Sequence, residues 1–373
     1  MCPNLDLVQT KAFLNECAYT TDYFSVALYQ EYNTNALCTS YRILNIQYIE
    51  VHHKELKNAY QSEGIWNELS ENIQIQDLPN HLKKFIEEYI LNQETEISKK
   101  INSKDKLLLR AMRNLLDRIL SLWDAFNYKT NLSINESTWA HDIFDPICQF
   151  ISFDLSELMI VWNNVISKAT CKRNDADDGP IKKPDILGTY ASMDRRYVWE
   201  MLYGEISNSP FANTNQSKIH KKGDRIKLGK FAKDSVDNGC KFYASNYSNL
   251  PFDFQKLNIF LLQSSGTFLE LFILDRKYTP LYRLRRLAIV ELSLQKNSLS
   301  TESIINLVSA LITYHKLLRD NLMIIKSIDR KLVVDSNDEK VIDIVEVKYN
   351  TLIPTSTTPR SSTNLKNQIN NKL

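Results

Sequence analysis

The chain of 373 residues has little glycine, and this excludes the common nucleotide-binding loops. It contains 8 Gly, and all but Gly64 lie between Gly179 and Gly266. No pair of them has the spacing G-x-G-x-x-G or G-x-x-x-x-G-K-[ST], in which backbone N–H groups hold a pyrophosphate at a helix N-terminus. We therefore expect neither a dinucleotide-binding fold nor a P-loop fold.

Cysteine clusters and long apolar runs are also absent from the sequence. The 6 Cys are scattered, with no C-x-x-C and no Cys/His spacing typical of zinc, so we expect reduced thiols without disulfides. The first ten residues lack a basic segment followed by an apolar one, and no stretch reaches about 18 unbroken apolar residues. We expect an intracellular protein, nuclear or cytoplasmic, that is neither secreted nor inserted into a membrane.

Neither sign of charge dominates. The 46 Lys and Arg residues nearly balance the 44 Asp and Glu residues, which leaves a formal charge of +2. Such a chain has no general attraction for polyanions, so binding of DNA or RNA would need a local basic patch. The hydrophobic content of 43% is enough to build a folded core.

The sequence divides into three predicted regions. Residues 1–130 should form a mostly helical N-terminal region, because apolar residues recur at helical spacing over 82–90 and 107–123. The segment 44–51 (LNIQYIEV) fits a strand or a helix. Residues 131–325 are predicted to form an α+β domain with a mixed sheet, and residues 326–373 a largely disordered polar tail.

Within the α+β domain, short apolar runs typical of strands alternate irregularly with helices. The capping box of Ser133 and Glu136 predicts a helix start, and Pro146 should kink or restart that helix. A second helix is predicted over 225–238, with Gly239 as its C-terminal cap, and a third over 302–318. Strands are predicted over 158–162, 186–190, 197–206, 241–247, 257–262 and 267–274, the last two joined as a hairpin at Ser264-Ser265-Gly266.

Two acidic residues stand on consecutive predicted strands. Asp185 follows Pro184 at the start of one strand, and Glu205 follows Gly204 near the end of the next. Acids so placed can converge on one side of a sheet, where two carboxylates and a backbone carbonyl such as that of Ile206 would hold Mg²⁺. The ion would lower the pKa of a bound water and stabilise charge on a phosphoryl oxygen.

This arrangement resembles the PD-(D/E)xK nuclease superfamily, with Pro184-Asp185 as the PD element and Glu205 as the second acid. The resemblance implies a central mixed sheet flanked by helices, and a further acidic role for Glu136 on the preceding helix. Residues 131–318 are also similar to a group of uncharacterised fungal proteins that have a Glu-bearing helix, an R/K-P-D strand, a G-E-x-K strand and a helix resembling RLGKFAKDAID. In this chain that helix reads RIKLGKFAKDSVD from Arg225.

One position departs from the family pattern. The lysine two residues beyond the second acid, which positions the attacking water in the family, is Ser207 here, and a hydroxyl cannot supply its positive charge. Some members carry this lysine on the following helix, where Lys227, Lys230 and Lys233 are candidates at near-helical spacing. We take Lys230 as the replacement, beside Asp185, Glu205 and Glu136 as the other catalytic residues.

A basic run lies on and before the same helix. Lys221, Lys222, Arg225, Lys227 and Lys233 could neutralise nucleic-acid phosphates beside the acidic site. The same run also fits a solvated helix face or a nuclear-import signal.

The acidic residues have ordinary structural interpretations as well. In these interpretations Asp185 initiates a turn, Glu205 is an exposed strand residue, and Glu136 closes its capping box, and none of the three has a catalytic role. The sequence therefore leaves two functions open. One is a nuclease-like protein with Mg²⁺-dependent phosphodiester hydrolysis, active or degenerate, and the alternative is a non-enzymatic protein-interaction or nucleic-acid-binding module on the same fold.

Overall fold

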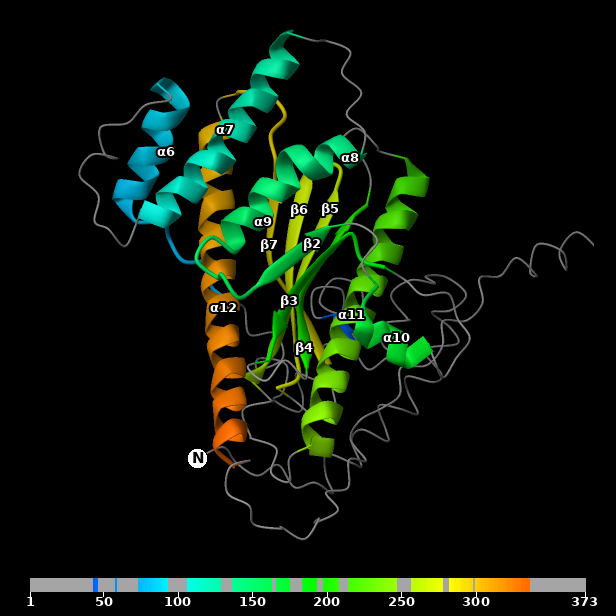
Figure 1. Cartoon of the computed structure of the whole chain (residues 1–373). Coiled ribbons are helices and arrows are strands. Elements are labelled where there is room, and N and C mark those ends of the chain that lie inside the picture. Colours follow the sequence, from blue (N-terminus) through cyan, green and yellow to red (C-terminus); the bar gives the residue numbers. More distant parts are fainter. Residues whose placement is uncertain are drawn as a thin grey trace, which may run out of the picture.

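A computed structural model places the residues that matter for these predictions. It describes residues 43–45, 58, 73–92, 106–128, 136–162, 166–174, 183–192, 197–207, 214–246, 256–277, 282–297 and 299–335. Within them the chain has an α+β fold, as the sequence predicts, in which long helices surround one mixed sheet (Figure 1).

The sheet of the described part has seven strands. Their spatial order is β1 (Ile43–Asn45), β7 (Tyr282–Glu291), β6 (Phe268–Asp275), β5 (Asn258–Ser265), β4 (Val198–Ile206), β3 (Ile186–Ala191) and β2 (Met159–Trp162). Strands β2, β3 and β4 are antiparallel, β4 and β5 are parallel, and β5, β6 and β7 are antiparallel again. The parallel β4–β5 pair needs a crossover connection, and α11 (Asn215–Asn246) supplies it.

Helices cover both faces of this sheet. The helices and helical turns are α6 (Asn80–Asn92), α7 (Lys106–Tyr128), α8 (Glu136–Trp139), η3 (Ala140–Phe144), α9 (Asp145–Ile151), α10 (Lys168–Asn174), α11 and α12 (Ser300–Asp335). Helix α11 packs on β4 and β5, while α12 packs on β5 and β7, and Figure 1 shows these two long helices on opposite sides of the sheet. The acidic strand ends described below lie on the α11 side.

The two helices predicted in the N-terminal region pack against the sheet-forming part. Helix α7 contacts α9, and α6 contacts α12. The Trp123 indole donates to the Ser293 carbonyl (2.8 Å), and the Gln76 amide donates to Thr313 Oγ1 (3.0 Å). Residues 44 and 45 of the ambiguous segment belong to the strand β1 (Ile43–Asn45), and the rest of that segment lies outside the described residues.

The helix that carries the basic run differs most from its prediction. It continues to Asn246, so the predicted strand over 241–247 is wrong, and Gly239 is not a cap. A Cβ at Gly239 would lie 2.3 Å from two ring carbons of Trp199 on β4. Trp199 also stacks on Tyr243 and donates to its hydroxyl (3.1 Å). Glycine is therefore needed here for close helix–strand packing, and the aromatic contacts hold the following turn in the helix.

Other boundaries follow the sequence more closely. Gly266 has φ 60° in the predicted β5–β6 hairpin, a conformation that glycine adopts without strain. A new α-helix, α9, begins at Asp145 directly after the π-helical turn η3, as the predicted restart at Pro146 requires. Pro146 lies in its first turn, where the missing N–H costs little. Helix α12 runs to Asp335, so the predicted tail does not begin at residue 326, and the residues beyond 335 lie outside the described part.

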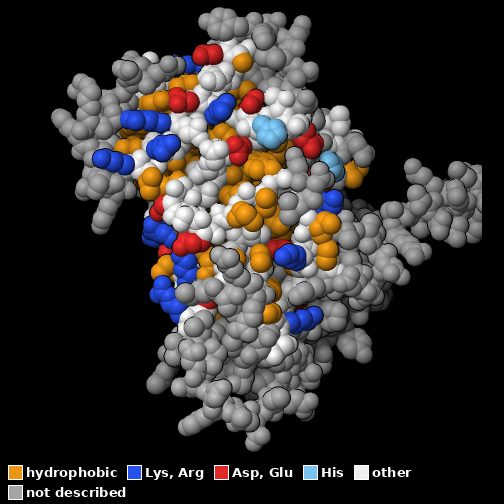
Figure 2. Space-filling view, in the orientation of Figure 1, with side chains coloured by type: hydrophobic (Ala, Val, Ile, Leu, Met, Phe, Trp, Pro, Cys, Tyr) orange, Lys and Arg blue, Asp and Glu red, His pale blue; other side chains and the backbone are white. Residues whose placement is uncertain are grey.

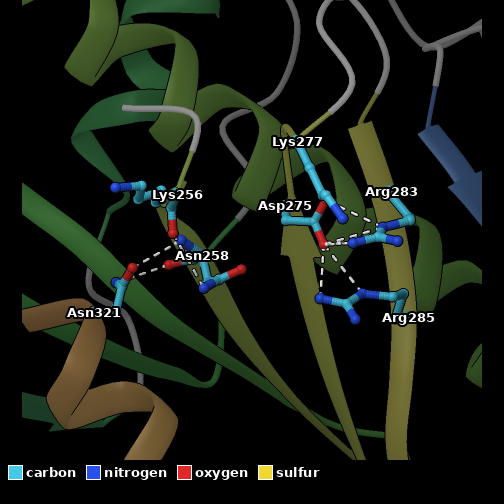
Figure 3. Close-up of polar contacts among 7 residues, drawn as sticks. All are labelled: Lys256, Asn258, Asp275, Lys277, Arg283, Arg285 and Asn321. Atoms are coloured by element: carbon cyan, nitrogen blue, oxygen red, sulfur yellow. Dashed lines mark hydrogen bonds and ion pairs between the residues drawn. The ribbon is translucent and has the colours of Figure 1, made fainter. Parts of the chain in front are cut away.

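Strand β7 is a further difference, since the sequence analysis assigned no strand to 282–291. Its arginines alternate poorly with apolar residues, but they pair with acids on the neighbouring strand. Figure 3 shows Arg283 and Arg285 of β7 on Asp275 of β6, with nitrogen–oxygen distances of 2.9 Å. The arginines, which made this segment unlike a strand in the sequence, are neutralised by acidic residues on the neighbouring strand β6.

The surface seen in Figure 2 carries mixed charge. Hydrophobic side chains gather near the middle of this face, at the level where Figure 1 shows the edge strand β2, and basic and acidic side chains are interspersed around them. Met159 of β2 is 61% exposed. Among the described residues, no helix is both long and apolar enough to cross a membrane.

Candidate functional site

The two predicted acids lie side by side where β3 begins and β4 ends. The Asp185 amide donates to the Gly204 carbonyl (3.1 Å), and the Asp185 carboxylate accepts a hydrogen bond from the Ile206 amide (2.8 Å). Asp185 is thus fixed against β4 by its own backbone and by its side chain. This local arrangement brings it beside Glu205, which stands between those two β4 residues.

Both acids point to the sheet face covered by α11. Ile186 pairs with Gly204, and a Cβ at Gly204 would lie 2.7 Å from the Ile186 side chain, so these two residues occupy the opposite face. Because side chains alternate along a strand, Asp185 and Glu205 face the other way. The Lys227 ammonium of α11 contacts Glu205 there at 2.7 Å. The geometry needed for the two acids to share one site is therefore present.

The electrostatics of this pair are unbalanced toward negative charge. Glu205 is only 3% exposed, and its pKa is raised well above the ordinary value by burial first and by the Asp185 charge second, although Lys227 lowers it. Burial also raises the pKa of Asp185, against the lowering effects of the Ile206 N–H and of Lys227. One oxygen of Glu205, Oε1, is buried without a hydrogen-bond partner. Two carboxylates here share the charge of one described lysine, and a buried acceptor is left unsatisfied.

Helix α8 and the N-terminal half of α11 each add an acidic residue near Asp185 and Glu205. Glu136 is the first residue of α8, and its pKa is raised by burial, then by Asp185, with a further raising effect from Asp224 and a lowering effect from His220. Asp224 is buried, and its carboxylate lies 3.6 Å from the ring nitrogen Nε2 of His220. The charges of Asp185 and Asp224 therefore act on Glu136.

Asp224 was not identified from the sequence. It is the single acid of the basic run, which made it look incidental. It stands four residues after His220 and three before Lys227, and residues three or four apart lie on one side of a helix. That spacing was the available signal, but it needed the position of α11 over the sheet to acquire meaning.

Lys227 contacts Glu205 at 2.7 Å, one turn before Lys230 on α11. Lys230, the predicted catalytic lysine, is 4% exposed. The reason is the phase of the helix, which is set by Phe231 stacking on Tyr203 of β4 (ring centroids 5.3 Å apart). Ser207, two residues beyond Glu205, is fully buried, and its hydroxyl accepts a hydrogen bond from Gln263 (3.2 Å).

The predicted nucleic-acid-binding residues have different environments. Lys233 is wholly buried in an ion pair with Asp237 (2.6 Å), so its assignment to a phosphate-binding surface is wrong. Lys222 is exposed, whereas the side chains of Lys221 and Arg225 are 26% and 23% exposed and both contact Glu270 at 2.6 Å. The basic run is therefore not one continuous solvated face.

The residues present fit a hard cation in their chemistry, although they do not form a complete ligand set. Among the described residues, no three or more His, Cys, Asp and Glu side chains form a group that could hold a metal ion. Asp185 and Glu205 offer the oxygen donors that Mg²⁺ prefers, and Mg²⁺ usually keeps several water ligands. A bound cation would give the Oε1 atom of Glu205, which has no hydrogen-bond partner, an electrostatic partner.

Comparisons with known protein families, with curated proteins and with solved structures found no match to this chain.

Proposed function

We propose that the acidic site binds Mg²⁺ and hydrolyses phosphodiester bonds in DNA or RNA. The observation that carries the proposal is the pair of half-buried Asp185 and buried Glu205 on one sheet face, with the unpartnered Oε1 of Glu205 beside the Lys227 contact. The order of the elements supports it as well. A Glu136-bearing helix, a strand preceded by Pro184-Asp185, a strand with Gly204-Glu205 and a basic helix follow one another as in the PD-(D/E)xK superfamily.

The chain's own residues have separable roles in this mechanism. Asp185 and Glu205 would hold the ion, which when bound lowers the pKa of a water ligand and stabilises charge on the phosphoryl oxygen. Lys227 balances Glu205 and places positive charge where the attacked phosphate gains negative charge. Glu136, whose pKa is raised by burial and then by the Asp185 charge, would accept the proton of the attacking water as general base.

The test has two independent readouts on the full chain. Cleavage of single- and double-stranded DNA and RNA is measured with Mg²⁺ or Mn²⁺, and ion binding is measured by calorimetry without nucleic acid. We expect Asp185→Asn and Glu205→Gln to remove both cleavage and ion binding, because each removes a charged ligand. Glu302→Gln, at an exposed position on α12, is the matched control and should change neither. Wild-type protein that neither cleaves nor binds the ions would refute the proposal.

A non-enzymatic role is the second candidate, and Ser207 is the observation that favours it. The family's lysine is replaced by a buried hydroxyl that is engaged by Gln263, so the charge that the family uses at this position is missing. Ion binding that Asp185→Asn abolishes, together with no cleavage of any of the four substrates, would establish this reading. Cleavage by the wild-type protein would exclude it.

A further inference from the structure

A second charged cluster lies on the same sheet face as the acids, and it has the opposite balance. Glu270 of β6 accepts contacts from Lys221 and Arg225 of α11, both at 2.6 Å, and from Arg286 of β7 at 3.5 Å. Three cations thus converge on one carboxylate. Their charge lowers the pKa of Glu270 although burial alone would raise it.

The cations are held in place by more than their ion pairs. Arg225 also donates from Nε to the Gln263 side chain (3.0 Å), and its guanidinium lies over the Phe272 ring, 4.9 Å from the centroid. Gln263 in turn donates to the Lys221 carbonyl (2.6 Å). The Arg225 side chain therefore has a fixed position before any ligand arrives, which lowers the entropy cost of binding.

The three basic side chains are more exposed to solvent than the carboxylate that they contact. The Glu270 side chain is 2% exposed, whereas those of Lys221, Arg225 and Arg286 are 26%, 23% and 35% exposed. An approaching anion would meet the basic groups while the carboxylate stays beneath them. Arginine forks match two oxygens of a phosphate, and lysine adds a point charge.

The position of the cluster connects it to the acidic site. Glu205 pairs with Gln263 in the β4–β5 ladder, and Gln263 pairs with Glu270 in the β5–β6 ladder. At a strand spacing of about 4.8 Å, Glu205 and Glu270 lie roughly 10 Å apart along one row. Gln263 stands between them and also donates to Ser207.

We propose that Lys221, Arg225 and Arg286 form a seat for a nucleic-acid phosphodiester next to the acidic pair. The seat holds a phosphate of the same nucleic-acid strand that passes over Asp185 and Glu205, and its role in cleavage rests on the proposed function. Arg286 was not part of the predicted basic run, and it stands 53 residues after Lys233, the last residue of that run.

The Asp275 cluster at the far end of β6 provides an internal contrast. Asp275 also pairs with two arginines (Figure 3), but the side chains of Arg283 and Arg285 are only 3% and 14% exposed. We assign that cluster to holding β6 and β7 together, since its cations are mostly out of reach of a ligand.

Binding is tested in EDTA, where no cleavage or metal bridging occurs. Affinity for a fluorescent single-stranded oligonucleotide is measured against salt concentration for Lys221→Gln, Arg286→Gln and Arg286→Lys. We expect each loss of charge to weaken binding about five- to tenfold and to lower the salt slope by roughly 0.7. Arg286→Lys should keep the slope and lose affinity, because lysine cannot make a bidentate contact.

Two control variants make the result specific. Lys241→Gln changes an exposed charge on the same helix, twenty residues or about 30 Å beyond Lys221, and should leave binding unchanged. Arg285→Gln should lower stability and leave the salt slope unchanged, and unfolding curves identify any variant that fails to fold. Equal affinity and slope for wild type, Lys221→Gln and Arg286→Gln would overturn the seat. Inorganic phosphate that protects the wild type against unfolding, without oligonucleotide binding, would also overturn it as a nucleic-acid site.

Binding and cleavage fail separately in this design. If the seat exists but the proposed hydrolysis does not, Arg286→Gln weakens binding in EDTA while wild-type protein cleaves nothing. If hydrolysis exists without the seat, wild-type protein cleaves and Arg286→Gln cleaves equally well at every substrate concentration.

Discussion

Glu205 and Glu270 are two buried glutamates in one row of the sheet, under one helix, with opposite electrostatics. The pKa of Glu205 is raised well above its ordinary value, and that of Glu270 is lowered. Burial raises both pKa values, so burial does not explain the difference. Glu205 shares Lys227 with the negative charge of Asp185, whereas Glu270 receives three cations. The number and sign of the neighbouring charges therefore decide which glutamate resists ionisation.

This difference suggests a division of labour along the row. The Glu205 end attracts positive charge, and the Glu270 end attracts negative charge. A metal ion and a nucleic-acid phosphodiester need adjacent sites of these two kinds. Gln263 lies between the two ends and forms hydrogen bonds with both Ser207 and Arg225. Substitutions at one end of the row should therefore affect ion binding or anion binding separately.

The largest effect is expected from Lys227→Met. It leaves Glu205 buried next to Asp185 without its cation, and breaking such a pair costs about 3 kcal/mol of unfolding free energy at pH 8. The cost should shrink toward pH 5, because Glu205 can take a proton in the folded state and then needs no cation. Urea unfolding at both pH values measures the difference.

The double variant Lys227→Met with Glu205→Gln serves as the control for that prediction. It removes the charge that was left unpaired, so it should recover most of the lost stability at pH 8. A loss that stays the same at both pH values and in the double variant would show that the Lys227 chain is needed for packing and not for charge.

Glu270→Gln should have the second largest effect, about 2 kcal/mol at pH 7, since it removes charge-assisted hydrogen bonds from three cations. The folded-state pKa of Glu270 is lowered below its ordinary value of 4.5. Its ionised form therefore adds stability that is present above that value and is lost as the pH falls through the lowered pKa. The difference in unfolding free energy between wild type and variant should therefore shrink as the pH falls below 4.5, and a difference that grows with acidification would contradict this prediction.

Binding of Mg²⁺ at the Glu205 end of the row should depend on pH. The raised pKa values of Asp185 and Glu205 mean that a cation must displace protons as it binds, so affinity for Mg²⁺ rises with pH through these values. One displaced proton gives up to about a tenfold gain per pH unit. Calorimetry in two buffers of different ionisation enthalpy counts the released protons, and a count of zero would exclude a protonated site.

The smallest effect is expected from Ser207→Ala. It removes one acceptor of Gln263, which still donates to the Lys221 carbonyl. The loss should be about 0.5–1 kcal/mol of unfolding free energy. A much larger loss, measured by urea unfolding, would show that Ser207 couples the two ends of the row more strongly than its single hydrogen bond indicates.

Local sequence signals predicted the strands that carry the acids. The apolar runs over 186–190 and 197–206 correspond to β3 and β4 within one residue at each end, and the hairpin at Gly266 is present. These elements are defined by neighbours in the chain, through alternation and turn chemistry. The acids were found for the same reason, because each stands next to a strand signal.

Elements that depend on distant contacts were missed. Gly239 looked like a helix cap until Trp199 was placed against it, and residues 282–291 were not assigned to a strand until Asp275 and Glu270 were placed beside their arginines. Lys230 and Lys227 could not be distinguished by spacing alone, since both lie on the helix that follows the acids.

The sequence by itself determined that Asp185 and Glu205 belong to consecutive strands and that a basic helix follows them. Only the tertiary structure decided that both acids face that helix, that Lys227 is the residue which contacts Glu205, and that Arg286 joins Lys221 and Arg225 on Glu270. The physical reason is that strand and helix periods are local properties, whereas the face that a helix presents to a sheet is fixed by packing between residues far apart in the chain, as Phe231 against Tyr203 does here.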